Sequence, residues 1–192
     1  MNNSIGEFKT NMQALLRPTR YEIEFSGPGI QAALGNSGLG QEFLQKLSIK
    51  CEKVSFPGKN IASQPYKLGG PIREMPYEML YTGDLSMIFR LGRSMEERKF
   101  FNTWQNFIVN PHTGNLNYYR NYICDIHVYQ LDGNDTRVYG LVVEECWPKI
   151  IEELSLGYDE IDTYHRQSIQ FAYRRWSELE VSAEEVGPRV PI

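Results

Sequence analysis

Cysteine is scarce in this sequence and is not arranged for a structural role. The three cysteines, Cys51, Cys124 and Cys146, lie far apart, and no pair has C-x-x-C spacing. This arrangement argues against a disulfide framework and a structural zinc site, and it indicates folding in a reducing compartment. Long apolar runs are also missing, since none approaches the roughly 20 residues of a membrane helix. The first residues lack the charged and apolar regions of a signal peptide, so we expect no membrane partner.

A surplus of basic residues is missing as well. The chain has 20 basic and 24 acidic residues, which gives a net charge of −4. A dedicated nucleic-acid binder carries a basic face, because neutralising phosphate dominates its affinity. Hydrophobic residues make up 41% of the 192 residues, which excludes the composition of a disordered chain and fits one packed domain.

Histidine is too sparse to build a catalytic or metal site. His112, His127 and His165 are dispersed along the chain, and a metal site needs at least three protein ligands. Each histidine is better explained as a hydrogen-bonded structural residue. Cys124 falls on the core side of its alternating segment, and no activating base is evident beside it. We therefore predict no enzymatic activity, no metal and no cofactor.

Two further patterns suggest chemistry only at first sight. The adjacent acidic pairs at 144–145, 152–153 and 159–160 would point to opposite faces of a strand, so each offers one carboxylate to any site. The glycine-rich stretch at 35–40 matches neither phosphate-loop pattern, and no buried parallel strand precedes it. Solvated acidic side chains and a flexible loop are the simpler interpretations.

Alternation of apolar and polar residues predicts a mainly β domain. Aromatic residues reach 12%, and Tyr and Phe favour half-buried strands. A strong turn signal, Asp132-Gly133-Asn134-Asp135, separates two of the alternating runs and predicts a hairpin. The predicted strands cover 21–25, 47–52, 85–91, 122–130, 137–144 and 169–173.

Four segments lie outside these patterns. We expect an N-terminal arm at 1–16, a glycine-rich insertion at 27–40 and a C-terminal tail at 177–192, around a single domain that spans 1–192. A segment rich in proline and glycine, 59–83, reads as irregular chain with short extended pieces. The arm and the insertion are expected to serve assembly more than folding.

One helix is predicted between 94 and 110. Ser94 and Glu97 have the spacing of a capping box, and Pro111 forces the helix to end. Aromatic and aliphatic residues recur on one face, which predicts burial against a sheet. The residues of this core face are Phe100, Phe101, Trp104, Phe107 and Ile108.

An aromatic run with one arginine, Tyr118-Tyr119-Arg120-Asn121-Tyr122, allows two interpretations. Tyrosines beside an arginine can stack single-stranded bases. Because the run leads into a strand and the chain is acidic, packing or a contact between subunits is favoured. A single-stranded nucleic-acid-binding module is the alternative from another functional class.

The order of these landmarks resembles the tail tube protein family of contractile-tailed bacteriophages. Arg17-Pro18 before the strand at 21, the stretch 51–58 ending in Phe56-Pro57-Gly58, and a strand leading into the aromatic helix are similar to the family's order. The most specific stretch begins at Trp147-Pro148 and ends in the strand 169–173. The resemblance covers about residues 17–176.

This resemblance implies a fold of two antiparallel sheets packed as a barrel-like sandwich with one flanking α-helix. It implies homo-hexameric rings that stack inside a contractile sheath, with baseplate and tape-measure proteins as partners. Double-stranded DNA would pass through the lumen, and assembly would take place in the host cytoplasm before the protein enters the virion tail. Arg17, Pro18, Tyr118, Tyr119 and Arg120 are candidate contacts between subunits or rings. The alternatives are a baseplate or neck ring of the same fold, or a tube like that of type VI secretion.

Overall fold

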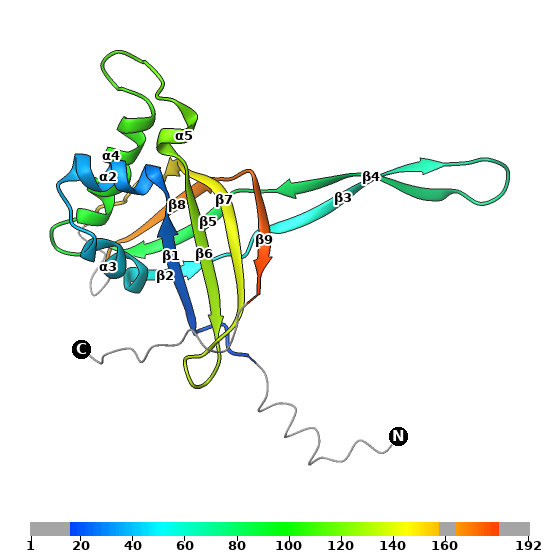
Figure 1. Ribbon diagram of the computed structural model, residues 1–192, viewed down its shortest axis with the longest axis horizontal. Helices are drawn as coiled ribbons and strands as arrows, with labels where there is room; N and C mark the ends of the chain where they lie inside the picture. The colour runs from blue at the N-terminus through cyan, green and yellow to red at the C-terminus, as the bar shows by residue number, and fades with distance from the viewer. Residues whose placement is uncertain (1–15, 158–163, 181–192) are drawn as a thin grey trace.

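The computed structural model describes residues 16–157 and 164–180, and its elements alternate between short helices and antiparallel strands (Figure 1). The predicted N-terminal arm and most of the predicted C-terminal tail lie outside these residues. The elements are β1 (Tyr21–Ser26), α2 (Pro28–Ser37), α3 (Glu42–Lys50), β2 (Cys51–Val54), β3 (Gly58–Tyr66), β4 (Arg73–Thr82), β5 (Leu85–Arg90), α4 (Glu96–Ile108), α5 (Tyr119–Tyr122), β6 (Cys124–Leu131), β7 (Arg137–Ile151), β8 (Arg166–Ala172) and β9 (Arg175–Leu179).

Seven strands form one hydrogen-bonded sheet that folds over into two layers. Their order is β1-β6-β7-β8-β5-β2, and β9 also pairs with β7. Layer A consists of β1, β6, β9 and the first part of β7, whereas layer B consists of β2, β5, β8 and the last part of β7. The sandwich of antiparallel strands therefore agrees with the predicted fold class.

Strand β7 changes layers at a bulge near Glu145. This residue has a left-handed φ of 56°, and the register of β7 with β6 shifts on the N-terminal side of Cys146. The Glu145 amide donates a hydrogen bond to Asp125 Oδ1 at 3.0 Å, which fixes the distorted backbone. Because a bulge bends its strand and increases its twist, β7 can pair with β9 on one side of the bulge and with β8 beyond it. The predicted strand at 137–144 therefore runs on to Ile151, through Trp147 and Pro148.

The hydrophobic core lies between the layers and is closed by α4. Leu85, Met87 and Phe89 face inward from β5, and Phe171 faces inward from β8. Four of the five residues on the predicted helix face, Phe100, Phe101, Trp104 and Ile108, are buried in this core, and Phe107 is half-buried.

The predicted capping box at the start of α4 does not form. The helix begins at Glu96, its N-cap is Met95 in the left-handed conformation, and no side chain caps it. Glu97 instead accepts a hydrogen bond from the Gly92 amide at 3.0 Å and forms an ion pair with Lys50 of α3. Tertiary partners have therefore replaced the local motif that the sequence suggests.

The glycine-rich segment at 27–40 is a helix and part of the core, not an irregular insertion. Ile30, Ala33 and Leu34 of α2 are buried. The Gly29 amide donates to the carbonyl of Ile123 at 2.9 Å, and a Cβ on Gly29 would lie 2.1 Å from the carbonyl oxygen of Tyr122. Glycine at this position lets α2 approach the chain that enters β6.

Three other local predictions need correction. Residues 42–50 form the helix α3, and the strand predicted at 47–52 is reduced to β2. Residues 119–122 form α5, not the start of a strand, and β9 extends to Leu179, into the predicted tail. The structure thus adds α2, α3 and α5 to the single flanking helix that the resemblance implies.

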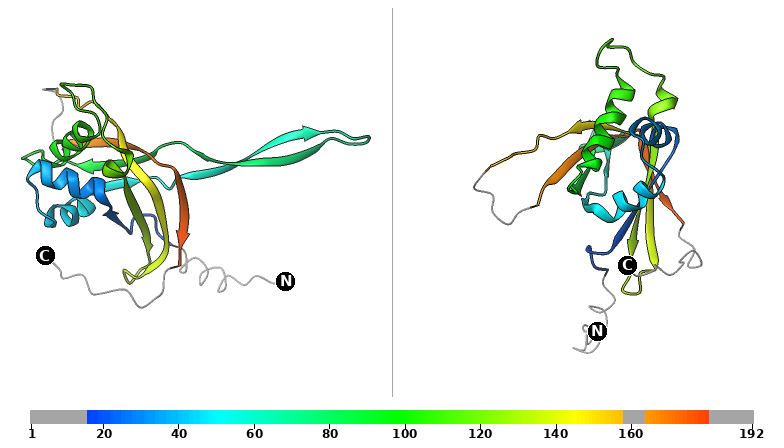
Figure 2. Two further views of the ribbon diagram at one scale, coloured as in Figure 1. Left: turned by 45° about the horizontal axis from the view of Figure 1, so that its top comes forward. Right: turned by 90° about the vertical axis from the view of Figure 1, so that its left-hand side faces the viewer.

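The segment 59–83, expected to be irregular, is a long hairpin that projects from the sandwich. Strands β3 and β4 pair along their whole length, with a register shift between Ala62 and Ser63. Figures 1 and 2 show the hairpin as a slender extension on the side away from the helices. Of the described helices, none is long and apolar enough to cross a membrane.

Candidate assembly surfaces

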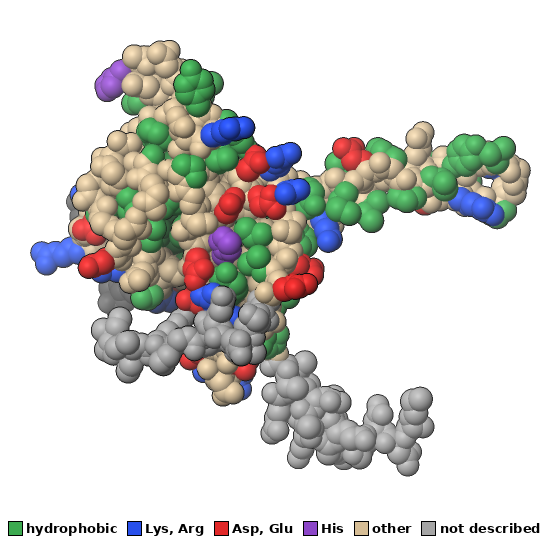
Figure 3. Space-filling model, viewed as in Figure 1, with side chains coloured by type: hydrophobic (Ala, Val, Ile, Leu, Met, Phe, Trp, Pro, Cys, Tyr) green, Lys and Arg blue, Asp and Glu red, His purple; other side chains and the backbone are tan. Residues whose placement is uncertain are grey.

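The outer face of layer A carries a group of acidic side chains. Along β1 and β6 the inward residues alternate with outward ones, so that Glu22, Glu24 and Asp125 point away from the core. Glu144 of β7 has the same orientation. Figure 3 looks onto this face and shows acidic side chains gathered over the strands. We call this surface the layer A face.

Arginines neutralise part of this acidic charge. Arg137 Nη2 lies 3.0 Å from Glu22 Oε2, and the same guanidinium pairs with Glu24 and lies over the ring of Tyr129. Arg175 Nε lies 2.7 Å from Glu144 Oε2. The face is therefore a network of ion pairs in which acidic groups remain in excess, since Arg137 serves two carboxylates.

His127 sits within the layer A face in a structural role. Its Nε2 lies 3.3 Å from Ser26 Oγ, and its ring stacks on Tyr129 with 6.3 Å between centroids. The Nδ1 atom is buried without a hydrogen-bond partner among the described residues. This arrangement agrees with the interpretation of His127 as a packed residue of the sheet.

Layer A ends in two strands that have one strand partner each within the described chain. Strand β1 pairs only with β6, and β9 pairs only with β7. On the side of β1 that faces away from β6, Ser48 Oγ of α3 donates to the Ile23 carbonyl at 2.5 Å, so α3 occupies part of that edge and the rest of it is open. An open strand edge offers backbone donors and acceptors to a further strand, so both ends of layer A are candidate surfaces for subunit pairing.

The β3–β4 hairpin exposes apolar side chains along most of its length. More than half of the residue surface is exposed at Ile61, Tyr66, Leu68, Ile72, Met75, Tyr77 and Met79. Its base is fixed to the body: Trp176 Nε1 lies 3.3 Å from the Gly58 carbonyl, and Lys59 Nζ lies 4.7 Å from the Trp176 ring centroid. A two-stranded hairpin is marginally stable alone, and large exposed apolar patches mark contacts with other proteins.

The loop between α4 and α5 presents the tyrosines that the sequence singled out. Tyr118 is 84% exposed, and Tyr119 and Arg120 are also on the surface. Asn110 Oδ1 accepts the amides of His112 and Thr113, and Asn117 Oδ1 accepts the amide of Tyr118, so side chains of the loop bond to its own backbone. Such an exposed aromatic surface suits a contact with another protein.

Tyr119 also reaches the bulge of β7. Its hydroxyl donates to Glu145 Oε2 at 2.9 Å, and Arg174 Nη1 lies 2.7 Å from Glu145 Oε1. Burial and the bond to Glu145 raise the pKa of Tyr119 to about 12. The hydrogen bonds from Arg174 and Tyr119 lower the pKa of Glu145, so this carboxylate stays charged at neutral pH.

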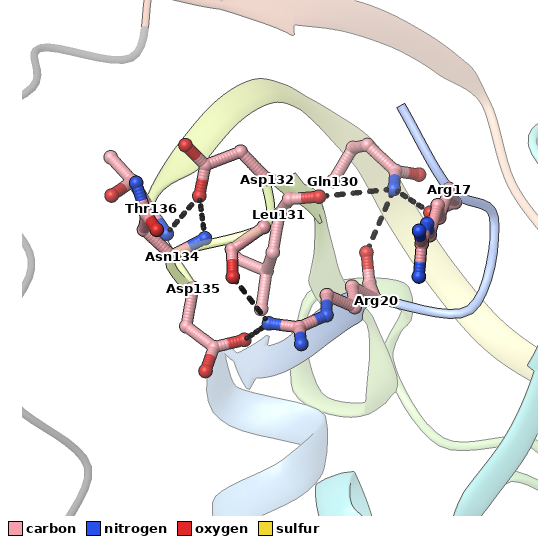
Figure 4. Close-up of polar contacts among 9 residues, drawn as sticks. Arg17, Arg20, Gln130, Leu131, Asp132, Asn134, Asp135 and Thr136 are labelled. Atoms are coloured by element: carbon pink, nitrogen blue, oxygen red, sulfur yellow. Dashed lines mark hydrogen bonds and ion pairs between the residues drawn. The ribbon is translucent and has the colours of Figure 1, made fainter. Parts of the chain in front are cut away.

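Arg17 and Pro18 lie on the surface where the chain enters layer A. Arg17 lies beside the turn between β6 and β7 (Figure 4). Gln130 Nε2 donates to the carbonyls of Arg17 and Arg20, at 2.7 and 2.8 Å. Arg20 Nη1 in turn donates to the Gly133 carbonyl and to Asp135 Oδ1, at 3.0 and 2.9 Å. Asp132 Oδ1 accepts the amides of Asn134 and Thr136 and so shapes the predicted turn.

The described residues include no metal-ligand group and no cysteine with a lowered pKa. Among them no group of three or more His, Cys, Asp or Glu side chains could hold a metal ion. All three cysteines are buried as free thiols, and burial raises the pKa of Cys51 to about 12 and the pKa values of Cys124 and Cys146 as well. Thiols of this kind are poor nucleophiles. The glycine-rich stretch 35–40 ends α2 and begins no phosphate loop.

Solved structures with the same fold come from contractile injection systems. A chain of the anti-feeding prophage baseplate has a TM-score of 0.61 at 9% identity, covering 88% of this chain and 97% of that one. A chain of the PVC sheath/tube terminator has a TM-score of 0.59 at 12% identity, with 86% and 97% coverage. A chain of the PVC sheath-tube complex has a TM-score of 0.56 at 14% identity, with 94% and 100% coverage.

No curated protein sequence matches the chain. The family model described as phage tail tube protein, in contrast, matches residues 16–179. This range includes the sandwich, the β3–β4 hairpin and both edges of layer A. The chain therefore belongs to the phage tail tube protein family and is a structural component of the virion tail.

Proposed function

We propose that six copies of this protein close into a ring through β1 and β9 and that such rings stack into a DNA-conducting tube. The observation that carries this proposal is layer A itself, a sheet with an open strand at each end and a polar outer face. Pairing β9 of one subunit with β1 of the next would join the layers into a continuous barrel, which removes the open edges. The similar baseplate chain comes from a structure with 6-fold symmetry.

The layer A face would then line the lumen. Glu22, Glu24, Asp125 and Glu144 would give the wall a net negative charge, although Arg137 and Arg175 offset part of it. Such a wall repels phosphate, so double-stranded DNA would pass without adhering. The same face disfavours the alternative of a single-stranded nucleic-acid-binding module, since phosphate binding requires a basic surface.

The β3–β4 hairpin is the candidate contact between stacked rings. Its exposed apolar residues need a partner, and it projects well beyond the sandwich. Ring stacking is heterologous, because the upper surface of one ring meets the lower surface of the next, and it produces an open filament. Tyr118, Tyr119 and Arg120 offer a second contact. Nothing in this arrangement calls for enzymatic activity.

A ring at the end of the tube is the second candidate function. It is favoured by the similarity to a baseplate chain and to a sheath/tube terminator chain, which share this fold. A main tube subunit should stack on copies of itself without limit, whereas a baseplate or neck ring should stop at one or two layers. Sheath, baseplate and tape-measure proteins are the partners expected in either case, with assembly in the host cytoplasm.

Electron microscopy of the purified protein tests the proposal, with one hairpin variant and two proline variants that separate its parts. Replacing residues 61–79 by a short turn should leave rings that do not stack. Ser177→Pro and Glu178→Pro remove adjacent backbone donors of β9, and because donors alternate along a strand, one of the two faces the open edge. The proline variant whose lost donor faces the open edge should fold but form no rings. Wild-type protein that stays monomeric at high concentration, or rings formed by both proline variants, would refute edge pairing.

A further inference from the structure

The outer face of layer B carries two arginines directly opposite each other. On β5 the buried Met87 and Phe89 alternate with the outward Ile88 and Arg90. Arg90 pairs across the strands with Arg166 of β8. Like charges at directly opposite positions destabilise a sheet unless an anion lies between them. This position therefore requires negative charge.

Among the residues that the structure describes, one carboxylate contacts the two guanidinium groups. Glu52 Oε2 lies 3.1 Å from Arg166 Nε and 3.5 Å from Arg90 Nε, so both arginines contact the same oxygen. Each guanidinium has five N–H donors, and the described residues occupy only one on Arg90 and two on Arg166. The arginines are 58% and 56% exposed. A net positive charge and several free donors remain at the surface of the described chain.

Tyr164 holds the two guanidinium groups in place. Arg90 and Arg166 lie over its ring, 5.3 and 4.8 Å from the centroid. Its hydroxyl lies 3.2 Å from both oxygens of Glu52 and accepts a hydrogen bond from Arg166 Nη2 at 2.9 Å. Arginines fixed in this way lose little side-chain entropy when they bind a further anion. We call Arg90, Arg166, Glu52 and Tyr164 the arginine pair site.

The arginine pair site faces away from the layer A face. Layers A and B enclose the core, and their outer faces point in opposite directions (Figure 2). If the layer A face lines the lumen, as the proposed function has it, the arginine pair site lies on the outside of the tube wall. DNA inside the tube cannot reach it, whereas a surrounding sheath can.

We propose that Arg90 and Arg166 bind an acidic side chain of the sheath protein. A planar carboxylate matches the fork of donors on a guanidinium and can accept two parallel hydrogen bonds from it. A carboxylate from the sheath would supply the second negative charge that Glu52 alone does not provide. The identity of this partner rests on the proposed function, but the preference for a carboxylate rests only on the geometry of the site.

Preassembled tubes of an Arg90→Gln/Arg166→Gln variant test the proposal by cosedimentation with the sheath protein of the same tail. Gln is shorter than Arg but keeps a polar hydrogen-bonding group on an unbranched side chain, and it removes the positive charge. The variant should form tubes at wild-type yield and bind the sheath protein about tenfold or more weakly, the loss expected for charge-assisted hydrogen bonds. Raising the salt concentration should weaken the wild-type complex, and affect the variant less.

The matched control is Lys46→Gln/Lys99→Gln, which removes two exposed positive charges from α3 and α4. It should bind the sheath protein as the wild type does. Sheath binding by the arginine variant at wild-type strength, or equal loss in the control, would overturn the proposal. Failure of the arginine variant to form tubes would also overturn it, because the two arginines would then serve a contact between subunits.

A second measurement separates this proposal from the proposed function, because it needs no ring. The unassembled wild-type protein is titrated with a hexaglutamate peptide and with a DNA duplex, and the Nε–H resonances of Arg90 and Arg166 are followed by NMR. Saturable shifts with the peptide, absent for Arg90→Gln/Arg166→Gln, support carboxylate binding even if no tubes form. No shift with the peptide, or tighter binding of the duplex, would refute it.

Discussion

Trp104 is the residue at which the core is most sensitive to truncation. It is fully buried at the centre of the α4 face, and its ring lies among Phe100, Phe101 and Phe171, with centroids 6.0, 6.5 and 6.2 Å away. Its Nε1 donates to the Tyr122 carbonyl at 2.9 Å, which ties α4 to the segment entering β6. Replacement by alanine would remove this aromatic contact and this hydrogen bond together.

We expect Trp104→Ala to lower the free energy of unfolding by about 3–5 kcal/mol, the usual cost of truncating a large buried aromatic residue. Trp104→Phe fills most of the space but leaves the Tyr122 carbonyl without its donor. That variant should lose about 1–3 kcal/mol, the cost of an unsatisfied buried acceptor. Because domains are stable by about 5–15 kcal/mol, the alanine variant should remain folded but be markedly weaker.

Urea denaturation of the unassembled protein measures both losses. The midpoint should fall from wild type to Trp104→Phe to Trp104→Ala, while the slope stays constant, since the surface exposed on unfolding is nearly the same. Losses of this size correspond to a lower melting temperature by roughly 2–4 °C per kcal/mol. A loss below about 1 kcal/mol for Trp104→Ala would refute the placement of this ring in the core.

Three further predictions concern other parts of the molecule. In a thermal melt, Gly29→Ala should destabilise the protein by about 3 kcal/mol or more, because its Cβ would meet the Tyr122 carbonyl oxygen at 2.1 Å. Gly35→Ala has no atom near its Cβ and should instead stabilise α2 by about 0.5–1 kcal/mol. Burial tends to raise the pKa of Glu97, but the hydrogen bonds from Lys50 and Gly92 outweigh it and lower that pKa. The stability that the Glu97–Lys50 ion pair contributes is therefore fully present above the unfolded pKa of about 4.3, and it is lost as the pH falls through the lower pKa of the folded state. A Glu97→Gln variant that lost as much stability as wild type over this acidic range would contradict this. Ile61→Ser/Met79→Ser changes a cross-strand pair that is exposed on the hairpin. It should change the free energy of unfolding by less than about 0.5 kcal/mol, yet prevent the rings from stacking. Tubes at wild-type yield would exclude the hairpin from ring contacts.

Half-buried strands and the aromatic helix are the parts that the sequence predicts well. Burial of one face imposes a period of two on β1, β5 and β8, and a helical period on α4, so the spacing of apolar residues predicts these elements. Buried Ile23 lies between Glu22 and Glu24, and buried Phe89 and Phe171 lie next to the polar Arg90 and Gln170. The open edges of layer A, in contrast, depend on the order of the strands in the sheet, and local sequence patterns do not predict that order.

The hairpin and the short helices escape prediction for a physical reason. Both faces of the β3–β4 hairpin are exposed in the single chain, so neither face imposes an alternation, and Pro65 and Pro76 argue against a strand. In α3, Phe43 and Leu47 are buried at helical spacing, but Leu47, Ile49 and Cys51 also alternate as a strand would. The arginine pair site combines residues from three strands and a loop, and only the folded register brings Arg90 beside Arg166.

Strand β7 gives the wall of the proposed tube a mechanical property. One covalent chain runs from layer A, whose outer face would line the lumen, through the bulge at Glu145 to layer B, whose outer face would point outward. The two surfaces therefore cannot slide past each other as separate sheets could, because shear between them would have to stretch or unpair β7. A force applied to the outside when a sheath contracts would be carried through each subunit to its inner surface, so the tube would move as one rigid rod.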